Sequence, residues 1–485
     1  MNLKLSVIWY WTANVLILAM VWISMYLNNS WPLLAVAVPL ILLDRAYVVP
    51  ILITIAAIEG SFKVEDAASQ AESTAILLVF PFFIYDYITN NKVKIPFKLS
   101  LLYIFFGFFV ILGMYIYSMH PQIKQYLAPL MTQMPKGVVG LIIKMVMKFL
   151  KIVFFFMFLK ILINKDRELI SRSLNLLKDL TPFVIGMVLL NMTLYGVVTE
   201  KFQTMHFGDS HHGDFSANMN ALGVFLYIGL LEKKTSFFKR LINLGGLACL
   251  LIIIMNLASR NGLLCFCILG VLAGGLGIWN KNWGTKFSII ITALFVVAIC
   301  AYIFKDSPTV ERFIYQTTEE GGGDRLSYWS AGLQSLKEDP LFGLGGDETS
   351  ALYAVGRYSP WVEDHVMHNT FIEFAVEYGI LGFIFYCIFQ YVILYHAYKN
   401  FMFAVTYNKI LLAAPSISYF LSIFAGLFVS RVWESTLWYN MTLIFAIYIL
   451  YRMPIEIAIK KRKKYAIYGM PDPLQNAMQL LPTNV

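Results

Sequence analysis

Long apolar runs recur along almost the whole chain, and they constrain its fold more than any other feature. The 485 residues are 59% hydrophobic and only 14% charged, whereas a soluble domain carries about 25% charged residues. Many of the runs approach the roughly 20 residues that an α-helix needs to cross the hydrocarbon core of a membrane. We therefore expect an all-α, polytopic integral membrane protein with about 12–14 transmembrane helices.

The apolar runs define candidate spans separated by short polar loops. Asp44 and Arg45 divide the short second and third runs, which form either a hairpin of two short helices or one kinked span. We expect the first run to be a span and not a cleaved signal peptide, because it is too long for the apolar part of one. The predicted spans are 5–27, 31–43, 46–58, 75–89, 99–118, 138–163, 181–198, 217–231, 241–258, 262–279, 287–304, 369–396, 410–429 and 437–452.

Basic residues cluster in loops that share one side of the membrane when about fourteen spans are counted. Short cytoplasmic loops are rich in Lys and Arg, so this side is the cytoplasm and both termini lie there. A count of about thirteen spans would reverse the side of the N-terminus. The net charge of +9 follows from these loops and indicates no binding of nucleic acid. The basic loops are 91–98, 165–178, 232–240, 280–286 and 460–464.

The remaining polar segments then gather on the opposite, extracytoplasmic face, and every histidine except His396 lies there or at its edge. The longest of these segments, 305–368, exceeds a simple connection and should contain short helices, one of them over 326–338. The chain thus divides into N-terminal transmembrane helices (1–180), transmembrane helices with polar motifs (181–304), the long loop (305–368), C-terminal transmembrane helices (369–452) and a basic cytoplasmic tail (453–485).

His368 and Asn369 stand where the long loop meets the next span. Histidine is the side chain that changes its charge near neutral pH, so it suits proton abstraction from a hydroxyl. The alternative is a histidine that only occupies the membrane interface. Asn369 fits this alternative, because asparagine is a good N-cap.

Two arginines on the same face are candidates for binding an anion. Arg260 lies between two apolar runs, and Arg325 follows a glycine-rich stretch. A guanidinium group binds phosphate oxygens through two parallel hydrogen bonds. The alternatives are a snorkelling arginine at 260 and a loop ion pair of Arg325 with Asp324 or Glu320.

Three other patterns have plainer explanations. Gly343, Gly345 and Gly346 lack the strand–loop–helix context of a nucleotide-binding loop, so we expect a tight turn. The stripe Lys144, Lys148 and Lys151 fits lipid headgroups or the interfacial start of a helix. We expect no metal site at His211, His212, Asp209 and Asp214, because no paired carboxylates stand at ligand spacing near a span end. The five cysteines lie in apolar spans, where we interpret them as packing residues.

Four stretches, in order, resemble motifs of the bacterial O-antigen ligase family and its polymerase relatives. The resemblance covers about residues 180–450. One departure is His212, where the family often has an arginine before the glycine. The stretches are GDFSANMNALG (213–223), LASRNGLLC (257–265), GDRLSYWSAGLQSLKEDPLFGLGGD (323–347), and His368-Asn369 followed by nine residues, Gly379, two residues and Gly382.

The resemblance implies a GT-C-like glycosyltransferase of the bacterial inner membrane, with its active site on the periplasmic face. The donor would be a glycan on undecaprenyl pyrophosphate, and the acceptor a hydroxyl of lipid A-core or of another glycan. Transfer would invert the anomeric configuration and need neither metal nor cofactor. The implied catalytic residues are His368 and Asn369, and Arg260 and Arg325 would bind the pyrophosphate. Weaker substrate contacts are implied for His212, Asn218, Asn220 and Arg431.

Several functions stay open at this point. A ligase transfers a finished glycan to the lipid A-core, whereas a polymerase joins repeat units. A flippase or transporter of lipid-linked glycans would place ionisable residues near the bilayer midplane of several spans. Most charges here gather at one face instead, apart from Asp44, Arg45, Asp86 and the Lys144 stripe. A non-catalytic partner in polysaccharide assembly is a further alternative, which the His and Arg set disfavours.

Overall fold

The computed structural model is all-helical over the residues that it describes. No strand occurs among these residues. The described residues are 3–27, 29, 31–58, 65–89, 94–120, 123, 137–164, 168–194, 212–232, 235–257, 259–278, 302, 305–307, 310, 325–345, 349–360, 367–429, 434–467, 478–479 and 481. The predicted span 287–304, apart from Tyr302, and the basic loop 280–286 lie outside them.

The helices follow the predicted apolar runs closely at the N-terminal end of the chain and less closely further on. Their bounds are α1 Leu3–Leu27, α2 Trp31–Leu43, η1 Arg45–Tyr47, α3 Val48–Ile58, α4 Glu65–Thr89, α5 Phe97–Met119, α7 Gly137–Asn164, α8 Glu168–Leu194, α9 His212–Leu231, α10 Phe237–Asn256, α11 Arg260–Ile278, α14 Arg325–Ser335, α15 Thr349–Tyr358, α16 Thr370–Thr406, η3 Ile410–Ala413, α17 Ala414–Ala425, α18 Ser435–Ile447, η4 Tyr448–Arg452 and α19 Met453–Ile467.

Seven of the described helical segments are long and apolar enough to cross a membrane, and five shorter apolar helices accompany them. Apolar side chains also face outward from these helices: Ile104 and Phe108 of α5 are 62% and 54% exposed. Exposed apolar side chains are stable against lipid tails, and an α-helix satisfies its own backbone hydrogen bonds there. The chain is therefore a polytopic helical membrane protein, as the sequence predicts. The seven long segments are Phe97–Met119, Leu169–Thr193, Gly213–Leu231, Phe237–Asn256, Arg260–Gly277, Thr370–Thr406 and Ser435–Arg462.

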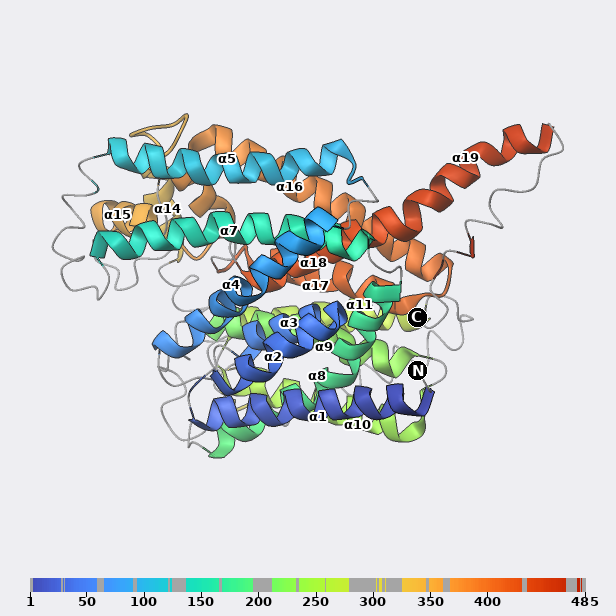
Figure 1. Ribbon diagram of the computed structural model, residues 1–485. Helices are drawn as coiled ribbons and strands as arrows, with labels where there is room; N and C mark the ends of the chain where they lie inside the picture. Colours follow the sequence, from blue (N-terminus) through green and yellow to red (C-terminus); the bar gives the residue numbers. More distant parts are fainter. Residues whose placement is uncertain are drawn as a thin grey trace.

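The long helices run side by side, and the short helices of the long loop lie at one end of the bundle (Figure 1). These short helices, α14 and α15, pack on each other and on α16. Helix α19 projects from the opposite end (Figure 1). The predicted helix over 326–338 is present as α14, Arg325–Ser335.

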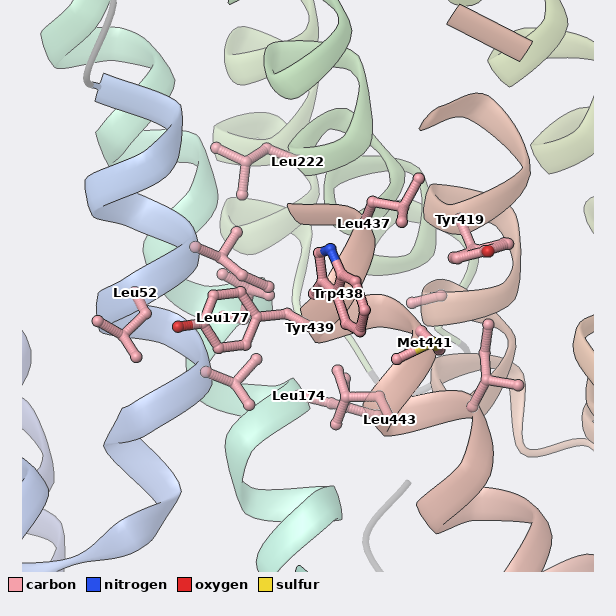
Figure 2. Packing of buried hydrophobic residues seen from close by; sticks show 14 of the residues in the cluster. Leu52, Leu174, Leu177, Leu222, Tyr419, Leu437, Trp438, Tyr439, Met441 and Leu443 are labelled. Atoms are coloured by element: carbon pink, nitrogen blue, oxygen red, sulfur yellow. The ribbon is translucent and has the colours of Figure 1, made fainter. Parts of the chain in front are cut away.

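Helix α18 lies at the centre of the bundle, and all thirteen of its residues are buried. Trp438 stacks on Phe155 of α7 with 5.7 Å between ring centroids, and Tyr439 meets the same ring edge-on at 4.7 Å. Leucines from α3, α8 and α9 surround these rings (Figure 2). The polar side chains Thr436, Asn440 and Thr442 each donate a hydrogen bond within the protein, so the helix can be buried on every side. This core supports the neighbouring helices α16 and α17, which carry one side of the candidate site.

Most spans differ from the predicted ranges by a few residues, and three differ by about ten. Helix α4 begins at Glu65 instead of 75. Helix α8 begins at Glu168, inside the predicted loop 165–178, and it crosses the section boundary placed after residue 180. Helix α16 reaches Thr406 instead of 396, and its backbone is non-helical at Gly379. Its 37 residues exceed the roughly 20 needed to span a membrane. The part before Gly379 is therefore a separate half-helix, which begins directly after Asn369.

Candidate functional site

Asn369 is the N-cap of α16, as its residue type predicts. Its Oδ1 accepts hydrogen bonds from the backbone N–H groups of Phe371 (3.0 Å) and Ile372 (3.1 Å). Its carbonyl oxygen accepts the N–H of Glu373 at 2.9 Å, and the N–H of Thr370 donates to the Gly426 carbonyl at 2.8 Å. The first four N–H groups of a helix lack partners within the helix. Here the three such groups of Thr370, Phe371 and Ile372 each have a protein acceptor, and the Glu373 N–H makes the first bond within the helix.

The end of α17 holds the start of α16. Asn369 Nδ2 donates to the Leu427 carbonyl at 3.2 Å, and Thr370 Oγ1 donates to the Val429 carbonyl at 2.9 Å. These contacts join two chain segments far apart in the sequence. Arg431, a predicted substrate contact, follows Val429 closely but lies outside the described residues.

His368 precedes this cap in a conformation that non-glycine residues rarely adopt. Its φ angle is +49°, and only 8% of the residue is exposed. Its ring lies 5.6 Å from the ring of Tyr328 in α14. Residues held in the left-handed region cluster at functional sites, where the surrounding structure offsets their strain. The site therefore includes α14, and Tyr328 was not singled out from the sequence.

Arg325 lies one turn before Tyr328 at the start of α14. Its guanidinium carbon is 5.8 Å from the centroid of the Phe428 ring. Phe428 follows Leu427, whose carbonyl accepts the hydrogen bond from Asn369. The structure thus brings Arg325, His368 and Asn369 together around one helix and the end of α17.

Arg260 is the first residue of α11 and is half-buried. The preceding Ser259 caps the helix, because its Oγ accepts the N–H of Gly262 at 3.0 Å. The same Oγ lies 2.9 Å from Ser216 Oγ of α9. A Cβ on Gly262 would lie 2.6 Å from Ser216 Cβ, so glycine is what allows α9 and α11 to approach closely here. The start of α11, with Arg260, is thereby fixed against α9.

Asn218 and Asn220 of α9 join helix N-termini. Asn218 Nδ2 donates to Glu434 Oε2 at 3.3 Å, and its Oδ1 accepts from Thr436 Oγ1 at 2.9 Å. Asn220 Nδ2 donates to the Gly262 carbonyl at 3.0 Å. Both amides therefore orient α18 and α11 against α9. Their contact with substrate stays a prediction.

His212 begins α9, and its side chain lies outside what the structure describes, as do His211 and Asp209. Within the described part of the chain, no group of three or more His, Cys, Asp or Glu side chains has the arrangement of a metal site.

Three buried or half-buried carboxylates near the site were missed in the sequence. Glu373 and Glu377 are buried in the half-helix after His368, and Glu434 contacts Asn218. The available signal was the presence of two acids inside an apolar run, which is costly unless they are used or paired.

Gly343 and Gly345 form the expected tight turn, and Gly346 lies outside the described residues. Gly343 and Gly345 have φ angles of +74° and +68°, and the Gly343 N–H donates to the Asp339 carbonyl at 3.0 Å. This turn packs on α16 at Gly379, whose φ is +66°. Two of the family-like stretches are thus in direct contact.

Residues 245–387 match the family model described as O-antigen ligase. The matched segment contains Arg260, Arg325, the turn at Gly343, His368, Gly379 and Gly382. No curated protein matches the chain. This all-helical membrane protein is therefore similar to the O-antigen ligase family over residues 245–387.

Proposed function

We propose that this protein transfers a glycan from undecaprenyl pyrophosphate to an acceptor hydroxyl at the periplasmic face of the bacterial inner membrane, with both termini in the cytoplasm. The observation that carries the proposal is the environment of His368. This buried residue with a positive φ lies between Tyr328 of the loop helix and the capped start of α16. It falls inside the segment that matches the O-antigen ligase family.

The leaving group needs positive charge from side chains. The N-terminus of a helix often binds phosphate through its exposed N–H groups. At α16 these groups already bond to Asn369 and Gly426. Stabilisation of the pyrophosphate therefore falls to arginines, and Arg260 and Arg325 are the candidates. Their planar guanidinium groups match phosphate geometry.

The chemistry is one displacement at the anomeric carbon. The acceptor oxygen forms a bond to this carbon while the bond from the carbon to the pyrophosphate oxygen breaks. The electron pair leaves with the pyrophosphate, which stays on its polyprenyl carrier. His368 takes the proton of the acceptor hydroxyl. Attack from the side opposite the leaving group inverts the anomeric configuration.

The arginines assist most if their bonds strengthen as negative charge grows on the leaving oxygen. Asn369 assists by holding the backbone on which His368 stands. The reaction proposed in this way requires no metal ion and no nucleotide-sugar.

The acceptor distinguishes a ligase from a polymerase, and both functions fit the same chemistry. Deletion of the gene in its host separates them. Long glycan chains that accumulate on the carrier lipid indicate a ligase, which transfers finished chains to the lipid A-core. Single repeat units on the core indicate a polymerase. A normal surface glycan in the deletion strain would contradict both functions.

A transporter of lipid-linked glycans is disfavoured by the partners of the ionisable residues within the bundle. Arg45 Nε pairs with Asp86 Oδ2 at 2.8 Å, and Asp44 Oδ2 pairs with Arg172 Nη1 at 2.7 Å. Arg452 is buried and donates to Asn400 Oδ1 at 2.8 Å. These contacts join η1 to α4, Asp44 to α8, and η4 to α16, so a structural role accounts for the charges that a transport pathway would use.

A further inference from the structure

Helix α16 is broken at Gly379, and a loop segment closes the break. We call Pro340–Gly345 the clasp. The clasp offers two N–H groups to the end of the first half-helix and two carbonyls to the start of the second. The hydrogen bonds are Leu344 N to Val376 O (2.8 Å), Gly345 N to Glu377 O (2.8 Å), Ile380 N to Pro340 O (2.9 Å) and Leu381 N to Leu341 O (3.4 Å).

These four hydrogen bonds satisfy backbone groups that any broken membrane helix leaves without partners. The ends of two half-helices expose N–H and carbonyl groups that cost several kcal/mol each without partners in hydrocarbon. Non-helical backbone is tolerated at such depth only where protein or water satisfies it. The clasp supplies these partners from the extracytoplasmic loop.

The clasp fits because its turn and the break in α16 both lack side chains. A Cβ on Gly343 would lie 2.6 Å from the Val376 carbonyl oxygen, and closer still to the backbone nitrogen of Gly379. A Cβ on Gly379 would lie 2.5 Å from the Phe342 nitrogen. Both glycines also have positive φ angles, which side chains disfavour. The two backbones are therefore in direct contact.

A second surface holds the clasp from the other side. Gly345 packs on α5, where its Cβ would lie 2.6 Å from the Gly113 carbonyl oxygen. A Cβ on Gly113 would in turn lie 2.6 Å from Cε1 of Tyr378, the last residue before the break. The clasp is thus enclosed between α5 and α16.

The clasp connects the two elements that carry the candidate site. Helix α14, with Arg325 and Tyr328, ends at Ser335, shortly before the clasp begins. The half-helix before the break begins at Thr370, two residues after His368. We propose that Gly343 and Gly379 are positioning residues, which set where Arg325 stands relative to His368. This proposal rests on the proposed transfer reaction for its effect on rate, but the positioning itself is measurable without it.

The first measurement is structural. One nitroxide label is placed at Ser330, which is exposed on α14. The other is placed at Tyr398, which is 60% exposed and lies in the half-helix of α16 that follows Gly379. The full chain, with its native cysteines replaced, is reconstituted in lipid, and the distance between labels is measured by pulsed electron spin resonance. We expect one narrow distribution in the parent, and a shifted or broadened one in Gly343→Ala and Gly379→Ala. The matched control is Gly274→Ala, whose Cβ would meet no atom within 4 Å.

The second measurement is kinetic, with purified lipid-linked donor and acceptor. Small displacements of reacting groups cost about 10²-fold in rate. We expect kcat to fall by about this factor in each clasp variant while KM for the donor changes by less than about threefold. Because both substitutions disturb one contact, the double variant should lose little more than either single variant. Independent damage to the fold would instead give losses that multiply, together with a raised KM.

The outcomes separate the two proposals. If the parent transfers no glycan, the proposed function fails, and the distance measurement still tests the clasp. An unchanged distance distribution in both clasp variants overturns the positioning role. So does a changed distribution with full transfer activity. Should Gly379→Ala fail to accumulate, Gly343→Ala decides the matter, because its Cβ is added on the loop side of the contact.

Discussion

The ring of Tyr328 lies 5.6 Å from the ring of His368, with an interplanar angle of 58°. Tyr328 is buried and stands one turn after Arg325. The loop helix thus touches the residue that we propose as the general base. An aromatic contact of this kind is worth about 0.5–1.5 kcal/mol.

The first prediction concerns this ring pair. Tyr328→Ala removes the surface on which the imidazole rests, and we expect transfer to fall by about threefold to tenfold, the equivalent of one aromatic contact. Tyr328→Phe keeps the ring and should stay close to the parent rate. Rates are measured in membranes with matched protein amounts. Equal losses in the two variants would mean that the hydroxyl matters and the ring does not.

The second prediction separates chemistry from packing at His368. His368→Gln keeps a hydrogen-bonding side chain of similar length, but an amide accepts no proton at neutral pH. General-base assistance contributes about 10²–10⁴-fold, and we expect a loss of this size in transfer with purified donor and acceptor. The parent enzyme should stay active with a strong chelator. An active glutamine variant would remove the general-base role, and sensitivity to chelator would direct attention to His211 and Asp214.

The sequence predicts the fold class and most helices because each depends on local apolar runs. The range 31–43 coincides with α2, Trp31–Leu43, since a polar pair ends the run at Asp44. The start of α8 was wrong for a long-range reason. Its first half buries Leu169, Leu174 and Leu177 against the core. Its charges find partners elsewhere in the fold, since Lys178 pairs with Glu232 at 2.7 Å and Arg172 pairs with Asp44 at 2.7 Å. A window of local sequence contains neither partner.

In the candidate site, too, local features could be predicted from the sequence and long-range contacts could not. The capping role of Asn369 was predicted from its residue type and its place before an apolar run, and the structure confirms it. The break at Gly379 was not, because Gly343 lies far away in the sequence and only the fold brings the two glycines into contact. The partners of Asn218 and Asn220 are remote for the same reason.

The third prediction tests the close contact of α9 and α11. In Gly262→Ala the new Cβ would lie 2.6 Å from Ser216 Cβ, so the helices must separate or shift. Overpacking of this kind costs about 1–3 kcal/mol, and we expect a lower thermal midpoint in detergent. Ser216→Gly removes the opposing atoms and should restore part of the midpoint in the double variant. A double variant no more stable than Gly262→Ala would argue against a direct clash.

The fourth prediction concerns orientation in the membrane. Ser330 on α14 and Lys460 on α19 are both exposed, and the two helices lie at opposite ends of the bundle (Figure 1). Each is replaced by a single cysteine in a chain without other cysteines. An impermeant thiol reagent added to intact spheroplasts should label the cysteine at 330 and leave the one at 460 unlabelled until the membrane is opened. Ser359 is unsuitable as a reporter, because it is only 2% exposed. The reverse pattern would place the loop helices in the cytoplasm and end the proposed use of a periplasmic donor.

The last prediction concerns the arginines proposed to bind pyrophosphate. Arg260→Lys and Arg325→Lys keep the charge but lose the planar pair of donors, and we expect each to lower transfer by about 10²-fold if the contacts tighten as the bond breaks. Arg357→Lys is the matched control, since Arg357 lies in the same loop but its guanidinium pairs with Glu338 at 3.6 Å and its side chain is 50% exposed. Exposed ion pairs contribute little, so this variant should transfer at the parent rate. A kcat that falls at 260 and 325 with an unchanged thermal midpoint identifies a role in the reaction. If both lysine variants transfer as fast as Arg357→Lys, the two arginines belong to the packing of α11 and α14, and the leaving group must be stabilised by other residues.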